Sequence, residues 1–154
     1  MLHKLNKREK GFTIIEVLIV LAIAALILLI VFLAVPALQR SARNTTIKND
    51  ASTLAGGFSE YESNNGGAAP ASPIAPSVGS VVIGGGNSVT ATVKVNGSTS
   101  VTSAASRPAK AKASTLYWDT GKACDGTPSP SAIAVYYYIE SSGGVSGTRQ
   151  CVDG

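Results

Sequence analysis

A single carboxylate, Glu16, stands at the edge of an otherwise apolar stretch, and it is the first residue whose chemistry needs a reason. All residues from Val17 to Val35 are apolar. A helix rising about 1.5 Å per residue could cross a hydrocarbon core of about 30 Å within that length. Ionisable groups in such segments are costly and usually have both a partner and a function. Glu16 is therefore a candidate site residue at the start of a predicted transmembrane helix.

Basic residues are concentrated before this helix and indicate its orientation. The formal net charge of the chain is +4, and the first eleven residues, with four Lys or Arg and one Glu, carry +3 of it. Lys and Arg ahead of a first helix hold that end in the cytoplasm. The excess positive charge is thus mainly a topology signal, and we expect the residues after the helix to face outward.

Two cysteines, Cys124 and Cys151, lie in the part of the chain that this orientation exports. Paired thiols in an oxidising compartment normally form a disulfide, and this one would close a loop of about 28 residues. A zinc site is the competing interpretation. It is a poor one because the cysteines are far apart and the only histidine, His3, precedes the helix. We expect no metal and no cofactor.

The sequence does not contain the residue sets from which active sites are built. After the basic leader there is no histidine, no Gly-rich phosphate loop and no obvious pair of nucleophile and base. We therefore expect a protein that is not an enzyme. A small basic cluster, formed by Arg107, Lys110 and Lys112, could contact DNA or another anionic surface weakly. A solvated loop is the simpler interpretation of that cluster.

Beyond Pro36 the sequence becomes amphipathic and predicts that the helix continues to about Asn64. Apolar residues recur at spacings of three and four, as on one buried face of a helix: Ile47, Ala51, Leu54, Phe58 and Tyr61. Gly56 and Gly57 weaken the helix locally. The Asn and Gly residues at 64–67 provide a stop, because both residue types tolerate the left-handed cap conformation.

The remaining sequence is rich in small residues but contains segments that predict a small antiparallel sheet. Residues 89–95 alternate between apolar and polar, Asn96-Gly97 suits a type I′ turn, and 98–104 would return as the partner strand. Other strands, connections and turns are also predicted: strands at 78–83, 116–118, 132–139 and 148–152, an extended connection at 68–76 and a turn at 141–147.

Together these elements predict an α+β fold, in which a long N-terminal α-helix packs on a small antiparallel β-sheet. Trp118 and alternate members of the run Tyr136, Tyr137 and Tyr138 should form the core against the helix, although the same aromatic residues could bind a ligand. Four segments are expected: a basic leader at 1–11, an apolar helix at 12–37, its amphipathic continuation at 38–65, and a β domain with a C-terminal disulfide loop at 66–154.

The order Gly11, Phe12, Thr13 and Glu16, between a basic leader and an apolar run, resembles the N-terminus of type IV prepilins and pseudopilins. The resemblance covers roughly residues 4–40. It implies that a membrane peptidase and N-methyltransferase cuts after Gly11 and methylates Phe12. It also implies that Glu16 pairs with the terminal amine of a neighbouring subunit, and that the fold is pilin-like, with a disulfide in the C-terminal region.

An ordinary secretory signal peptide is the main competing interpretation of this N-terminus. The run Ala22-Ile23-Ala24 offers a cleavage pattern for it. The fit is poor because Glu16 would lie inside the apolar core of the signal, and because the apolar run continues well past the cleavage pattern.

The resemblance implies a structural subunit of a surface filament that serves adhesion, motility or DNA uptake. The precursor would cross the cytoplasmic membrane once, with its N-terminus inside, before it is packed into the extracellular filament. Its partners would be identical or related subunits, membrane lipid before assembly, the processing enzyme, and an assembly platform with its ATPase. Two alternatives remain: a pseudopilin of a type II secretion or competence apparatus, and an unassembled membrane anchor that displays a small extracellular binding domain.

Overall fold

The computed structural model describes residues 11–70, 75–77, 79–84, 90–103, 114–141 and 147–154. The chain divides into two compact units, residues 1–39 and residues 40–154, and each is described by itself. The basic leader up to residue 10, the cluster of Arg107, Lys110 and Lys112, and most of the turn predicted at 141–147 lie outside the described residues.

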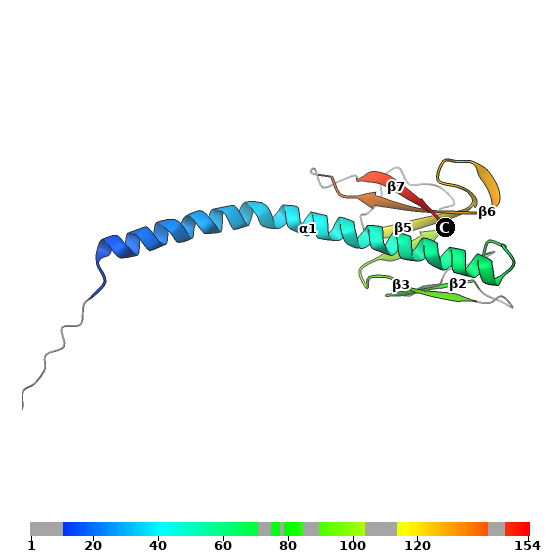
Figure 1. Cartoon of the computed structure of the whole chain (residues 1–154), viewed down its shortest axis with the longest axis horizontal. Coiled ribbons are helices and arrows are strands. Elements are labelled where there is room, and N and C mark those ends of the chain that lie inside the picture. The colour runs from blue at the N-terminus through cyan, green and yellow to red at the C-terminus, as the bar shows by residue number, and fades with distance from the viewer. Residues whose placement is uncertain (1–10, 71–74, 78, 85–89, 104–113, 142–146) are drawn as a thin grey trace, which may run out of the picture. The chain divides into compact units, whose positions relative to one another are not determined.

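Helix α1 runs Ile14–Asn64 and supplies the described helical residues of the first unit (Figure 1). It begins two residues later than predicted and ends where the sequence indicated. Leu, Ile, Ala and Val make up most of its first half, and of these Leu and Ala favour helices. Pro36 lies inside the helix, where its ring nitrogen cannot donate to the carbonyl of Phe32. By length and composition the helix could cross a membrane.

Glycines in the left-handed conformation end α1, as the sequence predicted. Gly66 and Gly67 have φ values of 69° and 81°, which a residue with a Cβ atom rarely adopts. The N–H of Gly67 donates to the carbonyl of Glu62 at 2.8 Å, and the N–H of Asn65 donates to the same carbonyl at 3.1 Å. These bonds satisfy a carbonyl of the last turn, so the helix stops without an unpaired acceptor there.

The second unit contains two small sheets, which lie on either side of the C-terminal part of α1 (Figure 1). Three strands form the first sheet, with antiparallel pairing throughout: β1 (Ala75–Ser77), β2 (Ser80–Ile83) and β3 (Ala91–Lys94). Four strands form the second, in the order β4-β5-β6-β7: β4 (Ser100–Ser103), β5 (Thr115–Lys122), β6 (Pro128–Ile139) and β7 (Thr148–Asp153).

The predicted hairpin across Asn96-Gly97 is wrong. β3 pairs with β2, whereas β4 joins the other sheet and runs parallel to β5. A type I′ turn needs positive φ at both central residues, yet neither Asn96 nor Gly97 has one. The N–H of Thr99 donates to the carbonyl of Asn96 at 2.9 Å, so residues 96–99 form a turn at which the chain passes from one sheet to the other.

The other strands lie close to their predicted positions, but they are arranged in different sheets from the one predicted. The single antiparallel sheet is replaced by two sheets, one of which is mixed because of the parallel pair β4–β5. The extended connection predicted at 68–76 ends in the short strand β1. Strands predicted at 78–83, 116–118, 132–139 and 148–152 are confirmed as β2, β5, β6 and β7, with β5 and β6 longer than expected. The α+β class is confirmed.

The helix contributes the predicted apolar stripe to the core of the second unit. All five stripe residues are buried: Ile47, Ala51, Leu54, Phe58 and Tyr61. The ring of Phe58 lies 5.6 Å from that of Trp118. Tyr137 belongs to the same buried cluster, which confirms that alternate tyrosines of β6 face the helix. Tyr136 and Tyr138 are buried as well, on the opposite face of β6, where Tyr138 meets Tyr117 edge to face.

Close packing against the first sheet explains why the helix-weakening residue Gly57 stands in the buried part of α1. A Cβ atom at this position would lie 2.0 Å from Cγ2 of Val93 on β3. The neighbouring Gly56 is exposed, and a Cβ atom there would have no neighbour within 4 Å. Close packing of α1 on the first sheet therefore requires glycine at 57 but not at 56.

Candidate functional site

Thr13 and Glu16 form a reciprocal capping box at the start of α1. The N–H and the hydroxyl of Thr13 donate to Oε2 of Glu16 at 2.9 Å and 2.7 Å. The N–H of Glu16 donates to Oγ1 of Thr13 at 3.3 Å. Two backbone N–H groups that the helix leaves without an internal partner are satisfied in this way. The carboxylate at the membrane edge therefore has an intramolecular role that the sequence interpretation missed.

A signal for this role was present in the sequence. The pattern Thr13-x-x-Glu16 directly before an apolar run is the signature of a capping box. Sequence reasoning had considered Glu16 only as an acid that needs a partner on another chain or at the lipid headgroups. Both bonds from Thr13 end on Oε2. Among the described residues, Oε1 of Glu16 has no hydrogen-bond donor, so this oxygen can accept a further donor from outside the chain.

The bond between Gly11 and Phe12 lies in an accessible, non-helical segment. Residues 11–13 precede the helix and are exposed, and the Phe12 side chain is 89 % exposed. An open hollow of about 520 Å³ is lined by Phe12, Glu16, Val17, Val20 and Leu21. Its lining is apolar except for the one carboxylate. A peptidase could reach this peptide bond, and an apolar segment with an amine could occupy the hollow.

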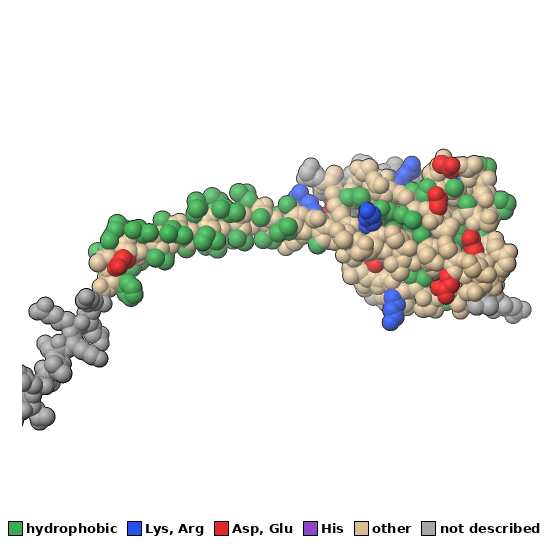
Figure 2. All heavy atoms as spheres, viewed as in Figure 1, with side chains coloured by type: hydrophobic (Ala, Val, Ile, Leu, Met, Phe, Trp, Pro, Cys, Tyr) green, Lys and Arg blue, Asp and Glu red, His purple; other side chains and the backbone are tan. Residues whose placement is uncertain are grey.

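The apolar surface of the first unit has no cover within the described part of the chain. Figure 2 shows hydrophobic side chains along the visible face of this helical segment. Large apolar side chains from Phe12 to Leu38 are between 39 % and 89 % exposed. A patch of this extent is far beyond what soluble monomers leave in water, so lipid or other protein must cover it.

These features coincide with a known family signature. Residues 6–32 match the model of the prokaryotic N-terminal methylation motif. The chain carries this methylation motif. Such a motif is the class III leader of type IV pilins and pseudopilins, and it supports a precursor of that kind. The motif implies processing by a prepilin peptidase and assembly with other pilin subunits, and with the apolar helix it indicates a membrane-anchored precursor. No curated protein and no solved structure matches the chain.

Outside the methylation motif, the predicted disulfide joins Cys124 and Cys151. Their Cα atoms lie 5.7 Å apart, within the usual range for such a bond. Asp153 accepts a hydrogen bond from the N–H of Cys124 at 2.6 Å, so β7 is tied to the loop after β5 by one covalent and one polar contact. Sulfur atoms of both cysteines lie within 4.8 Å of the Asp153 carboxylate. Because the two sulfurs are bonded to each other, they do not offer thiolate ligands to a metal.

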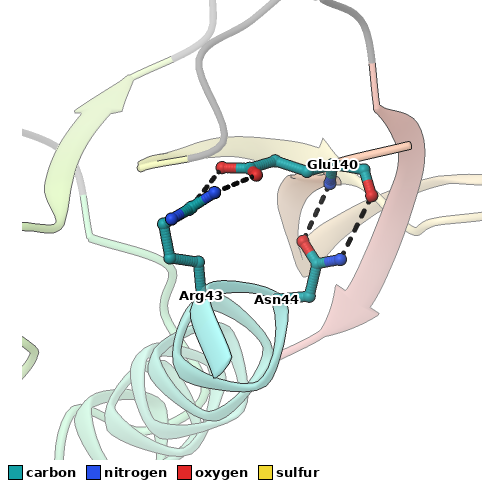
Figure 3. A network of polar contacts seen from close by, with 3 residues as sticks. All are labelled: Arg43, Asn44 and Glu140. Carbon is teal, nitrogen blue, oxygen red and sulfur yellow. Dashed lines mark hydrogen bonds and ion pairs between the residues drawn. The ribbon is translucent and has the colours of Figure 1, made fainter. Parts of the chain in front are cut away.

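A polar network between α1 and the end of β6 was not predicted (Figure 3). Nε and Nη2 of Arg43 donate to the two carboxylate oxygens of Glu140 at 2.9 Å and 2.8 Å. The amide of Asn44 donates to the carbonyl of Glu140 at 3.2 Å and accepts from its N–H at 2.8 Å. The Arg43 guanidinium lowers the pKa of the Glu140 carboxyl. No local sequence pattern joins residues so far apart in the chain.

Asp50 is a second residue whose role was missed. It is buried on α1 and accepts hydrogen bonds from the N–H of Asn96 at 3.1 Å and from Oγ1 of Thr99 at 2.5 Å. Both donors belong to the turn at which the chain changes sheet. Asp50 is not among the five residues of the apolar stripe that the sequence predicts. The structure shows that it is buried beside that stripe because this turn supplies its hydrogen-bond donors.

The aromatic residues proposed as an alternative ligand site lie in the protein interior. Trp118 and Tyr136 to Tyr138 are all buried, which supports a packing role. The guanidinium of Arg149 lies 5.8 Å from the ring centre of Tyr136, in the range of a cation–π contact.

Proposed function

We propose that this protein is a structural subunit of a type IV pilus-like surface filament. Processing removes residues 1–11 by cleavage between Gly11 and Phe12, and the new amine of Phe12 is methylated. Residues 12–37 then form the filament core, residues 38–65 continue the helix, and residues 66–154 form the outer domain. The observation that carries the proposal is the match to the methylation motif over residues 6–32.

Exposure of the apolar helix supports packing between subunits. In the precursor, lipid covers the side chains between Phe12 and Val35. Extraction of the subunit from the membrane removes the contacts of these side chains with lipid. In the filament, equivalent helices of other subunits cover the same side chains, so contacts between helices replace the contacts with lipid. An assembly platform and its ATPase supply the work of extraction. The leader holds the N-terminus in the cytoplasm before that step, and the C-terminal domain faces out.

The capping box supports a second contact for Glu16 after processing. Cleavage before Phe12 leaves the Thr13 N–H intact, so the bonds from Thr13 to Oε2 persist in the mature chain. Thr13 thereby holds the carboxylate in place, while Oε1 can accept the cationic Phe12 amine of another subunit. Opposite charges attract more strongly in the low-dielectric surroundings of packed helices than in water, which favours this pairing over contact with solvent.

Two substitutions separate the charge of Glu16 from its capping role. Glu16→Gln keeps an oxygen that can accept from Thr13, because Gln also completes a capping box, but it removes the negative charge. We expect Glu16→Gln to insert and be cleaved, yet to yield far fewer sheared filaments than the wild type. Thr13→Ala is the matched variant. It removes the Thr13 hydroxyl, which donates to Oε2 of Glu16 and accepts from the Glu16 N–H, but it keeps the negative charge of Glu16. Its assembly defect should therefore be smaller than that of Glu16→Gln.

The yield of sheared filaments, normalised to the cleaved subunit in the membrane, provides the measurement. Wild-type yield from Glu16→Gln together with a defect in Thr13→Ala would assign Glu16 to the cap alone. A cleaved subunit that is never found in sheared material from wild-type cells would instead support an unassembled anchor. Enrichment of this chain in short, non-surface fibres of a secretion apparatus would support the pseudopilin alternative.

A further inference from the structure

The turn that carries the chain between the two sheets holds an exposed Asn-Gly pair in a reactive arrangement. Asn96, Gly97 and Ser98 are all exposed, and the turn lines an open hollow of about 340 Å³. Oδ1 of Asn96 accepts hydrogen bonds from the N–H of Ser98 at 3.0 Å and from its hydroxyl at 2.8 Å. These two bonds restrain the Asn96 side chain and polarise its amide carbonyl, whose carbon is the one that the Gly97 nitrogen can attack.

We propose that Asn96 is a site of spontaneous deamidation, at which the folded chain promotes its own conversion to aspartate and isoaspartate. The backbone nitrogen of Gly97 loses its proton and attacks Cγ of Asn96, and ammonia leaves as a five-membered succinimide closes. Water then opens either carbonyl of the ring. Opening one carbonyl restores a normal backbone with Asp, and opening the other leaves the chain running through the β-carbon as isoaspartate. The balance is one water consumed and one ammonia released.

Three features of the turn favour this reaction. Gly97 has no side chain to hinder the approach of its nitrogen. The two donors from Ser98 point at the oxygen that becomes negative in the tetrahedral intermediate, which is the arrangement of a small oxyanion hole. Ring closure within one dipeptide also needs no diffusional encounter, because the attacking nitrogen and the amide carbon belong to neighbouring residues.

The chain provides its own comparison site at Asn65-Gly66. There the side-chain Nδ2 of Asn65 donates to the carbonyl of Tyr61 at 2.8 Å, and the residue is half-buried at the end of α1. This bond directs the amide back along the helix, and it holds the nitrogen that would have to leave. Asn65 should therefore react more slowly than Asn96, although the two dipeptides are chemically identical.

Conversion of Asn96 has a structural consequence because of Asp50. The N–H of Asn96 donates to Oδ1 of the buried Asp50 carboxylate at 3.1 Å. A new carboxylate at position 96 adds a like charge near that group. The extra methylene that isoaspartate adds to the backbone also moves this N–H relative to Thr99, the second donor to Asp50. Ageing at Asn96 should therefore loosen the turn between the sheets, whether or not the protein assembles into filaments.

The rate test uses the full-length chain in detergent, incubated in mildly alkaline buffer and analysed by peptide mapping and isoaspartyl methyltransferase labelling. We expect Asn96 to convert several-fold faster than Asn65 in the folded chain, and the two rates to converge in urea-unfolded chain. Ser98→Ala should slow conversion at Asn96 by about two- to tenfold, since it removes one neutral donor. Equal rates at the two sites in the folded chain, or an unchanged rate in Ser98→Ala, would overturn the proposal.

A second measurement tests the consequence for Asp50. Aged wild-type protein should unfold at a lower temperature than fresh protein, in proportion to the fraction converted at Asn96. Asn96→Ser keeps a side-chain acceptor for Ser98 but has no amide to lose, so its unfolding temperature should not change on ageing. An aged wild-type sample that is largely converted yet unfolds like fresh protein would refute the coupling to Asp50.

Discussion

At the scale of single residues, the ion pair between Arg43 and Glu140 gives the second unit, residues 40–154, a defined response to acid. Arg43 lowers the pKa of Glu140 in the folded chain, so the unfolded state binds more protons at this group than the folded state does. The contribution to stability is present above the ordinary Glu pKa of about 4.3. It is lost as pH falls through the lower, folded pKa.

Glu140→Gln measures this contribution while keeping the backbone bonds to Asn44. We expect the variant to unfold at a lower temperature than wild type near neutral pH, and the difference to shrink as the buffer is taken to about pH 3. The effect should be modest and reduced by salt, because the Arg43 side chain is 54 % exposed. A difference that grows in acid would show that Glu140 is not stabilised as a carboxylate.

The residues also show where sequence reasoning succeeded and where it could not. Glu16 was identified from its unusual place, and Thr13 could have been added from the capping-box spacing. Glu140 could not have been paired with Arg43, because only the folded sheet brings the end of β6 to the helix. The burial of Asp50 could not have been predicted from the helix sequence, since the donors that allow it belong to a turn in a different part of the chain.

At the scale of elements, the approach of α1 to β3 depends on Gly57. We expect Gly57→Ala to destabilise the second unit by about 1–3 kcal/mol, because the new methyl group would overlap Cγ2 of Val93 and force a shift of packed elements. Gly56→Ala is the matched control. Its methyl group meets nothing within 4 Å, so it should stabilise the helix by about 0.5–1 kcal/mol. Chemical denaturation of both variants tests this, and equal effects would contradict the packing account.

The C-terminal strand β7 depends on the disulfide in the same way. Cys124→Ser should lower the free energy of unfolding of the second unit by about 2–5 kcal/mol, because the loop to Cys151 is no longer closed in the unfolded chain. Asp153 still holds the N–H of residue 124 in this variant, so the native pairing of β6 and β7 should survive. Exported protein with both thiols free and unchanged stability would show that the bond makes no contribution.

The elements divide into those fixed by local pattern and those fixed by distant contacts. The helix, its end and its buried face follow from apolar periodicity and from the Asn and Gly residues at 64–67. The partners of β3 and β4 do not follow from local pattern, because an Asn-Gly dipeptide permits a hairpin but does not require one. Here Asp50 binds the turn after which the chain enters the other sheet. The parallel pairing of β4 with β5 cannot be predicted from the alternation of apolar and polar residues along either strand.

At the scale of the whole molecule, each unit of the chain has a different requirement. The second unit buries its own core and contains the Cys124–Cys151 disulfide. The apolar helix has no cover from the described residues, and its capped carboxylate keeps one oxygen available. We propose that such a chain is stable first in lipid and then among its own copies, and the methylation motif at its N-terminus supports this.

Intact-mass spectrometry of subunits from sheared surface filaments tests the central claim most directly. We expect the mass of residues 12–154 with one methyl group on the Phe12 amine and two hydrogens lost at the Cys124–Cys151 disulfide. Loss of residues 1–11 moves the charge balance from +4 to +1, which isoelectric focusing can check on the same sample. A mature subunit that retains residues 1–11, or one that begins after Ala24, would contradict processing at Gly11 and the assembly role assigned to Glu16.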